Sequence, residues 1–194
     1  MNPHIIRIVP SPQAPYTLVS EKLESLGFAR YDAPTAEPQP VSENEIWLSN
    51  DERSAVHWIV DDLIGVSYLA VRGTDAIALS EQLRIQLPTD SVVKLQLRAI
   101  ADRDTDALMD TLYRTAVAAD SGYDPDAYSL LRWGLNDLDP LVRRVALVAV
   151  SITGWTEFAE LLAWVSAHDP VEQVRAQAIS VCTLLREQTI KTSP

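Results

Sequence analysis

The sequence lacks the features that mark several common classes of protein. It has a single cysteine, Cys182, so an intrachain disulfide cannot form, as is usual for proteins of a reducing cytosol. No apolar run approaches the roughly 20 residues that a membrane-spanning helix needs. The apolar run Ile5–Val9 is too short for the core of a signal peptide. From these absences we expect a cytoplasmic protein.

Basic charge is also scarce. The chain carries 16 Lys and Arg against 27 Asp and Glu, a net charge of −11, and the acidic excess is present in both halves. An acidic surface repels the phosphates of nucleic acids and of anionic membranes, but it attracts basic proteins. The composition therefore predicts no nucleic-acid or membrane partner, and favours a basic protein as the partner.

The residues that are present suit a globular protein made of two unlike parts. The composition is 47% hydrophobic and 22% charged, and 194 residues are enough for one domain or two small ones. Prolines cluster early, with a proline-rich segment over residues 33–45 that predicts a linker or surface loop. We predict a small α+β unit over residues 1–88 and a helical unit over residues 89–194.

The first unit combines helical and strand patterns. Three runs rich in β-branched and aromatic residues are separated by short polar turns, which predicts a three-stranded antiparallel meander. A short strand and a helix precede the linker, and a helix follows the meander after a cap at Thr74 or Asp75. The expected strands are Ile5–Val9, Glu45–Ser49, Ala55–Val60 and Ile64–Arg72, and the expected helices are Tyr16–Phe28 and one ending at Leu87.

The second unit shows a helical period throughout and contains an internal repeat. Helices are predicted over residues 89–101, 104–119, 127–137, 141–152, 156–167 and 171–187. The pattern Leu130-Leu131-x-Trp133 recurs as Leu161-Leu162-x-Trp164. The later elements of the unit recur in the same order, and a period of about 30 residues indicates stacked helical pairs. These later elements are Asp139-Pro140 with Asp169-Pro170, Val142-Arg143 with Val174-Arg175, and Ala146 with Ala178.

Each residue of the repeat has a physical role. Aspartate at the start of the second helix accepts hydrogen bonds from free backbone N–H groups, and proline suits the first helical turn because its missing N–H costs nothing there. A weaker echo of the pattern lies at Asp90-Ser91-x-Val93-Lys94. Because one helix pair cannot bury its own apolar face, the pairs must stack.

The unit Asp139-Pro140-x-Val142-Arg143-x-x-Ala146, placed after a Leu-Leu helix, resembles HEAT-type repeats, and especially the short repeats of bilin-lyase-like proteins. The resemblance covers about residues 125–188. It implies that the first helix of each pair is convex and the second concave, and that repeated Asp and Arg residues pair along the stack. The residues that would hold the repeat roles are Asp139, Pro140, Arg143, Asp169, Pro170 and Arg175.

Such repeats mostly make binding surfaces, so we expect a non-enzymatic adaptor that binds another protein. An inhibitor or immunity-type protein that neutralises a basic toxin or enzyme is a special case of this reading, and an enzyme or chaperone resembling the bilin lyases is the alternative. A homodimer through an exposed strand edge is also possible. The candidate contact residues are Arg144, Val148, Ser151, Ser180 and Thr183 on the concave face, and Trp155, which we expect to be exposed because it lies outside the repeat pattern.

No constellation in the sequence predicts a catalytic residue, a metal or a cofactor. His4, His57 and His168 are scattered, and we interpret His57 as structural. The acidic series Asp102, Asp104 and Asp106 alternates as in a calcium loop, but Ala107 stands where that loop needs glycine, so helix capping is the favoured interpretation. We interpret Asp120, Asp124 and Asp126 as part of a solvated turn, and a weak ion site is the alternative for them. Trp133 and Trp164 are expected to pack in the core. Cys182 is expected to be a buried, unreactive side chain.

Overall fold

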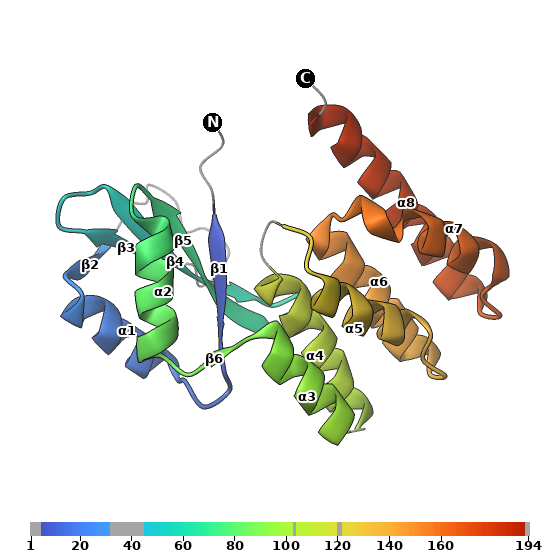
Figure 1. Ribbon diagram of the computed structural model, residues 1–194, viewed down its shortest axis with the longest axis horizontal. Coiled ribbons are helices and arrows are strands. Elements are labelled where there is room, and N and C mark those ends of the chain that lie inside the picture. Colours follow the sequence, from blue (N-terminus) through green and yellow to red (C-terminus); the bar gives the residue numbers. More distant parts are fainter. Residues whose placement is uncertain (1–4, 32–44, 103, 120–121, 193–194) are drawn as a thin grey trace. The chain divides into compact units, whose positions relative to one another are not determined.

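The computed structural model describes residues 5–31, 45–102, 104–119 and 122–192, with side chains described as far as residue 187 (Figure 1). The chain forms two compact units, Met1–Ser91 and Val92–Pro194. The first contains an antiparallel sheet with helices, and the second contains helices in contacting pairs. The α+β fold class predicted from the sequence is therefore confirmed.

The first unit contains a six-stranded antiparallel sheet with the strand order β2-β3-β4-β5-β1-β6. The predicted meander is present as β3, β4 and β5, but β2, β1 and β6 extend it on both sides. The helix predicted to reach Phe28 ends at Ser25, and Phe28 begins a strand. The strands are β1 (Ile6–Pro10), β2 (Phe28–Tyr31), β3 (Glu45–Ser49), β4 (Ser54–Asp61), β5 (Val66–Gly73) and β6 (Thr89–Asp90).

Helices α1 (Tyr16–Ser25) and α2 (Ala76–Gln86) share one core with one face of this sheet. Alternate residues of each strand point toward the helices, so that Val56 and Trp58 of β4 are buried while His57 between them is only half-buried. The two helices contribute apolar side chains at helical spacing to the same core. The buried residues of this core include Ile6, Ile8, Val19, Leu23, Trp47, Val56, Leu69, Val71, Leu79 and Leu83.

The second unit consists of helix pairs, in which α3 contacts α4, α5 contacts α6, and α7 contacts α8. The second helices of these pairs also contact one another, since α4 packs on α6 and α6 packs on α8 (Figure 1). The weak repeat pattern at Asp90-Ser91-x-Val93-Lys94 would make α3 the second helix of a pair, in contact with α6. In the structure α4 is the second helix of the first pair and contacts α6. The elements are α3 (Val92–Ala101), α4 (Thr105–Ala118), α5 (Pro125–Leu135), α6 (Pro140–Thr153), η1 (Thr156–Phe158), α7 (Ala159–His168) and α8 (Glu172–Thr192).

Aspartates cap helices of this unit, as the sequence predicted for Asp104 and Asp139; Asp124, which was interpreted as part of a solvated turn, caps α5 as well. The Asp104 carboxylate accepts a hydrogen bond from the Ala107 N–H at 3.0 Å, and Asp124 accepts from Asp126 and Ala127 at 2.8 and 2.9 Å. Asp139 accepts from the Leu141 N–H at 2.8 Å. Each cap satisfies backbone donors that have no partner within the helix.

A glycine lets α5 approach its neighbours closely. A Cβ atom on Gly134 would lie 2.8 Å from Leu112 Cδ1 and 3.1 Å from Ala146 Cβ, on α4 and α6 respectively. Alanines 146, 149 and 178 are fully buried, which keeps the helix axes close along the row. Among the helices of the described ranges, none is long and apolar enough to cross a bilayer.

Candidate functional site

An ion pair joins two successive helix pairs of the second unit. Arg143 on α6 donates from Nε and Nη2 to the two carboxylate oxygens of Asp169, at 2.7 and 3.0 Å. The remaining Nη1 donates to the backbone carbonyls of Asp137 and Leu138 at 2.9 and 3.0 Å. Arg143 is 7% exposed and Asp169 is 6% exposed, so the pair is almost entirely removed from water. Such two-pronged pairing fixes the relative position of both groups.

The electrostatics of Asp169 follow from this setting. Burial alone would disfavour its charged form, but the hydrogen bonds from Arg143 and from the Val171 N–H and the nearby charges of Arg143 and Arg175 outweigh that effect. Together they lower the pKa of Asp169 below its ordinary value. The carboxylate therefore stays ionised at neutral pH and holds the loop between α7 and α8 against α6.

The hydrogen bond from an α6 arginine to the loop before its helix recurs in the next repeat. The aspartates that correspond to each other in the two loops are not the pair expected from the sequence. Arg175 donates to the backbone carbonyl of Asp169 at 2.6 Å, as Arg143 does to that of Asp137. Asp137 and Asp169 also both accept the N–H of the residue two positions later. In the structure Asp169 is thus the counterpart of Asp137 rather than of Asp139. Pro140 begins α6 as predicted, whereas Pro170 precedes the first residue of α8 by two positions.

A polar link crosses the row of second helices beside this ion pair. Arg144 on α6 donates from Nε to Oε1 of Gln177 on α8 at 3.2 Å, and Gln177 returns a hydrogen bond to the Arg144 backbone carbonyl at 3.0 Å. On the other side, Arg144 is close enough to Tyr113 of α4 to act on its pKa, which burial raises and the guanidinium opposes. Arg144 thus links α6 to α8, and its charge acts on Tyr113 of α4, while its own side chain remains exposed.

Four other predicted contact residues lie on α6 and α8. Val148 and Ser151 follow Arg144 at helical spacing on α6 and are half-buried, while Ser180 and Thr183 are exposed on α8. The hydroxyls of these serines and of the threonine donate to backbone carbonyls of their own helices, at 2.7 to 3.2 Å. We call the surface formed by Tyr113, Arg144, Val148, Ser151, Gln177 and Ser180 the α6 face.

Gln177 and Tyr113 were not among the residues predicted from the sequence. Gln177 lies 33 residues after Arg144, one more than the offset that relates Val142-Arg143 to Val174-Arg175, and this spacing is the only sequence signal that could have suggested it. Tyr113 belongs to a helix that carries neither the Asp-Pro nor the Val-Arg element of the repeat. No sequence pattern therefore pointed to it.

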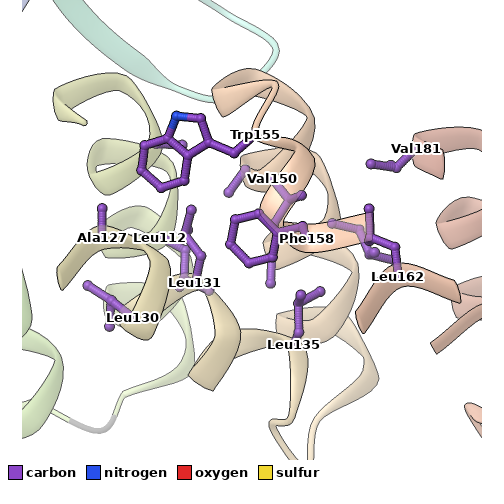
Figure 2. Packing of buried hydrophobic residues seen from close by; sticks show 14 of the residues in the cluster. Leu112, Ala127, Leu130, Leu131, Leu135, Val150, Trp155, Phe158, Leu162 and Val181 are labelled. Atoms are coloured by element: carbon purple, nitrogen blue, oxygen red, sulfur yellow. The ribbon is translucent and has the colours of Figure 1, made fainter. Parts of the chain in front are cut away.

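The predicted exposure of the tryptophans is wrong in every case. Trp155 is 5% exposed and packs edge-on against Tyr123, with ring centroids 5.4 Å apart. Trp133 and Trp164, expected in the core, are 40% and 55% exposed. Matching positions in successive repeats therefore share an outward direction, and Trp155 instead supplies a buried ring where the chain passes from one pair to the next (Figure 2).

The residues considered for other chemistry have ordinary surroundings. Burial and the Arg72 charge lower the pKa of His57, and the His168 ring stacks on Trp164. The half-buried Cys182 has its thiol pKa raised by burial. No group of three or more His, Cys, Asp or Glu side chains in the described ranges is placed to hold a metal ion. His4 and Asp120 lie outside the described residues.

Comparison with known proteins gives no relative from which a role could be transferred. No protein-family model, no curated protein and no solved structure matches this chain.

Proposed function

We propose that the protein is a non-enzymatic interaction module that binds a basic protein on its helical unit, through the α6 face. The observation that carries this proposal is Arg144, which is tied to Gln177 on the next second helix and remains exposed. A side chain fixed in this way has already lost much of its rotamer freedom, so a partner that bonds to it loses little further entropy.

The arrangement of the helices in contacting pairs supports this proposal. The row α4, α6 and α8 presents one surface made of second helices, and the Arg143–Asp169 pair fixes the step between two of them. Stacked repeats with a fixed step form extended surfaces suited to a protein segment. The resemblance noted in the sequence points to the same class of fold.

The net charge determines the kind of partner. At −11 the protein attracts a basic macromolecule over a distance comparable to the screening length, about 8 Å at physiological salt. The α6 face itself adds hydroxyls, an amide and the apolar Val148, which can give short-range contacts. Attraction by the whole molecule sets the association rate, and the local contacts set the lifetime of the complex.

The test compares matched arginine substitutions in the full chain. Ser151→Arg places a bulky positive charge on the α6 face, and Ser129→Arg does the same on the outer side of α5, where the hydroxyl also bonds to a backbone carbonyl. Tagged proteins are used to capture partners from the source cells, and each partner identified by mass spectrometry is purified and titrated by calorimetry.

We expect a basic protein that binds the wild type and Ser129→Arg with equal affinity, binds Ser151→Arg at least tenfold more weakly, and binds all of them more weakly in higher salt. A purified partner that is acidic, or that binds both variants equally, would contradict the proposal. Turnover of a small molecule by the purified protein would favour an enzyme instead.

A further inference from the structure

A small pocket lies between the start of α7 and the second half of α8. It is lined by Thr156, Ala159, Cys182, Leu185 and Arg186, which apart from Arg186 present mostly apolar surface. None of these residues belongs to the α6 face, so the pocket is a separate feature from the surface of the proposed function.

The internal repeat shows what the corresponding position in the preceding pair contains. With the offset that relates Leu130-Leu131 to Leu161-Leu162, Ala159 corresponds to Tyr128. With the offset that relates Val142-Arg143 to Val174-Arg175, Cys182 corresponds to Val150. The counterpart of the pocket is therefore the space between Tyr128 of α5 and Val150 of α6.

That counterpart is filled by an aromatic side chain. Phe158, from η1, is fully buried and stacks on Tyr128 with ring centroids 4.5 Å apart. Figure 2 shows its ring beside Val150 and Leu131, between the helices of one pair and the start of the next. Phe158 thus acts as a plug that joins successive pairs. In the filled site, Tyr128 forms one wall. At the corresponding position of the pocket between α7 and α8, the chain has the smaller Ala159.

We propose that this pocket is a docking site for a protein segment that presents an aromatic side chain next to a carboxylate. The aromatic ring follows from the repeat, because the equivalent socket takes Phe158. The carboxylate follows from Arg186, the one charged side chain among the described residues that line the pocket, and the chain's own plug has Glu157 directly before Phe158. A buried ring supplies most of the contact area, and the carboxylate adds a charge-assisted hydrogen bond.

The occupant is a different protein rather than a second copy of this chain. Phe158 of another copy is buried in its own socket and cannot reach the pocket. Trp164 is exposed, but Leu162, Ala163, Val165 and Ser166 give it no acidic neighbour within two residues. Tyr123 and Tyr31 are also exposed and each precedes an aspartate in the sequence. The Tyr123 ring packs on Tyr128 and Trp155 while Asp124 caps α5, and Tyr31 is held in β2 by its pairing with β3, so a second copy is kept as an outcome of the test below.

The test uses the full chain and a peptide with the sequence of the plug. Acetyl-Thr-Glu-Phe-Ala-amide is titrated into the isotope-labelled protein while backbone amide shifts are followed by NMR. We expect concentration-dependent shifts at the amides of Ala159, Cys182 and Arg186. Replacement of Phe by Ala in the peptide should weaken binding at least tenfold, and replacement of Glu by Lys should weaken it severalfold.

Two exposed alanines on α7 provide matched variants. Ala159→Asp places a carboxylate at the pocket, whereas Ala163→Asp places one a turn further along the same helix, outside the residues that line it. The first should abolish the shifts and the second should leave them unchanged. Both chains should keep the wild-type circular dichroism spectrum, so that loss of binding is not confused with unfolding.

The proposal is overturned if the peptide moves none of the three amides at millimolar concentration, or if the Ala peptide binds as well as the Phe peptide. It is equally overturned if Ala159→Asp still binds, or if the protein alone shows concentration-dependent shifts at these amides, since the occupant would then be a second copy. None of these outcomes bears on the α6 face.

Discussion

Arg143 is a charged side chain that the fold has removed almost completely from water, and every one of its donors named above has an acceptor. Burial of a charge is costly, and in this case the opposite charge of Asp169 and two backbone carbonyls offset the cost. The main effect of Arg143 is therefore to fix positions, because it holds the loop before α6 and the loop before α8 at a fixed separation. A substitution that removes only one partner leaves the other charge buried and alone.

Arg143→Met keeps most of the apolar stem but removes the charge. We expect it to lower the free energy of unfolding by about 3 to 5 kcal/mol, because Asp169 remains buried without its partner. The measurement is urea unfolding followed by circular dichroism. Arg132→Met, at an exposed site on α5, is the control and should change stability by less than about 0.5 kcal/mol. Equal effects of the two substitutions would show that the buried pair has no special role.

The roles of residues could be predicted from the sequence where they depend on interactions with residues a few positions away. Asp104 and Asp139 act on backbone groups two or three positions away, so their capping roles could be predicted from the neighbouring residues. Asp124 caps α5 in the same way, although the sequence had indicated only a solvated turn there. Exposure was predicted badly, because burial of Trp155 depends on Tyr123 and Phe158 rather than on its place in the repeat. A repeated residue indicates a repeated environment, and for Trp133 and Trp164 that environment is the outside of the molecule.

At the scale of elements, the joint between helix pairs is made by η1 and not by the long helices alone. Phe158 stacks on Tyr128 of one pair and directly precedes α7 of the next, so a single ring contacts both. Loss of such a ring removes apolar contact and leaves a cavity that rigid helices fill only in part.

Phe158→Ala should lower the free energy of unfolding by about 3 to 5 kcal/mol, the usual cost of emptying a buried aromatic site. Trp164→Ala removes a larger ring, but one that is 55% exposed, and should cost less than about 1 kcal/mol. Denaturant unfolding of both variants checks this. A larger loss for Trp164→Ala would mean that the exposed surface around Trp164, rather than the joint, stabilises the unit.

Element boundaries were predicted unevenly for a related reason. The meander β3–β5 joins strands that are adjacent in sequence, and its runs of β-branched and aromatic residues with short polar turns were sufficient to predict it. β6 and β2 are short, and neither is close in sequence to its partner. β6 pairs with β1, at the other end of the unit, and β2 pairs with β3, which follows the proline-rich segment, so no local pattern indicated them. The α6 face was predicted in part, because Arg144, Val148 and Ser151 share one helix, whereas Gln177 required knowledge of how α8 packs.

At the scale of the whole molecule, each unit has its own apolar core. One core consists of residues from Ile6 to Leu87, and the other of residues from Leu95 to Leu185. A unit with its own core can in principle fold alone. The chain therefore combines an α+β unit and a helical unit that can be studied apart.

We expect the fragment Val92–Pro194 to keep a helical circular dichroism spectrum and to unfold in a single sigmoidal transition. The reason is that the buried residues from Leu95 to Leu185 pack on one another. Thermal melts of the fragment and the full chain provide the measurement. A fragment that is helical but melts without a cooperative transition would show that its core requires residues of the first unit.

The position of β1 also bears on synthesis of the chain. This strand leaves the ribosome before the other strands of its sheet, yet both of its neighbours, β5 and β6, are encoded much later. It can pair with β5 only after Gly73 has been added to the nascent chain, and with β6 only after Asp90. Completion of this sheet thus depends on contacts between residues far apart in the sequence, whereas each downstream helix pair joins helices that are adjacent in sequence.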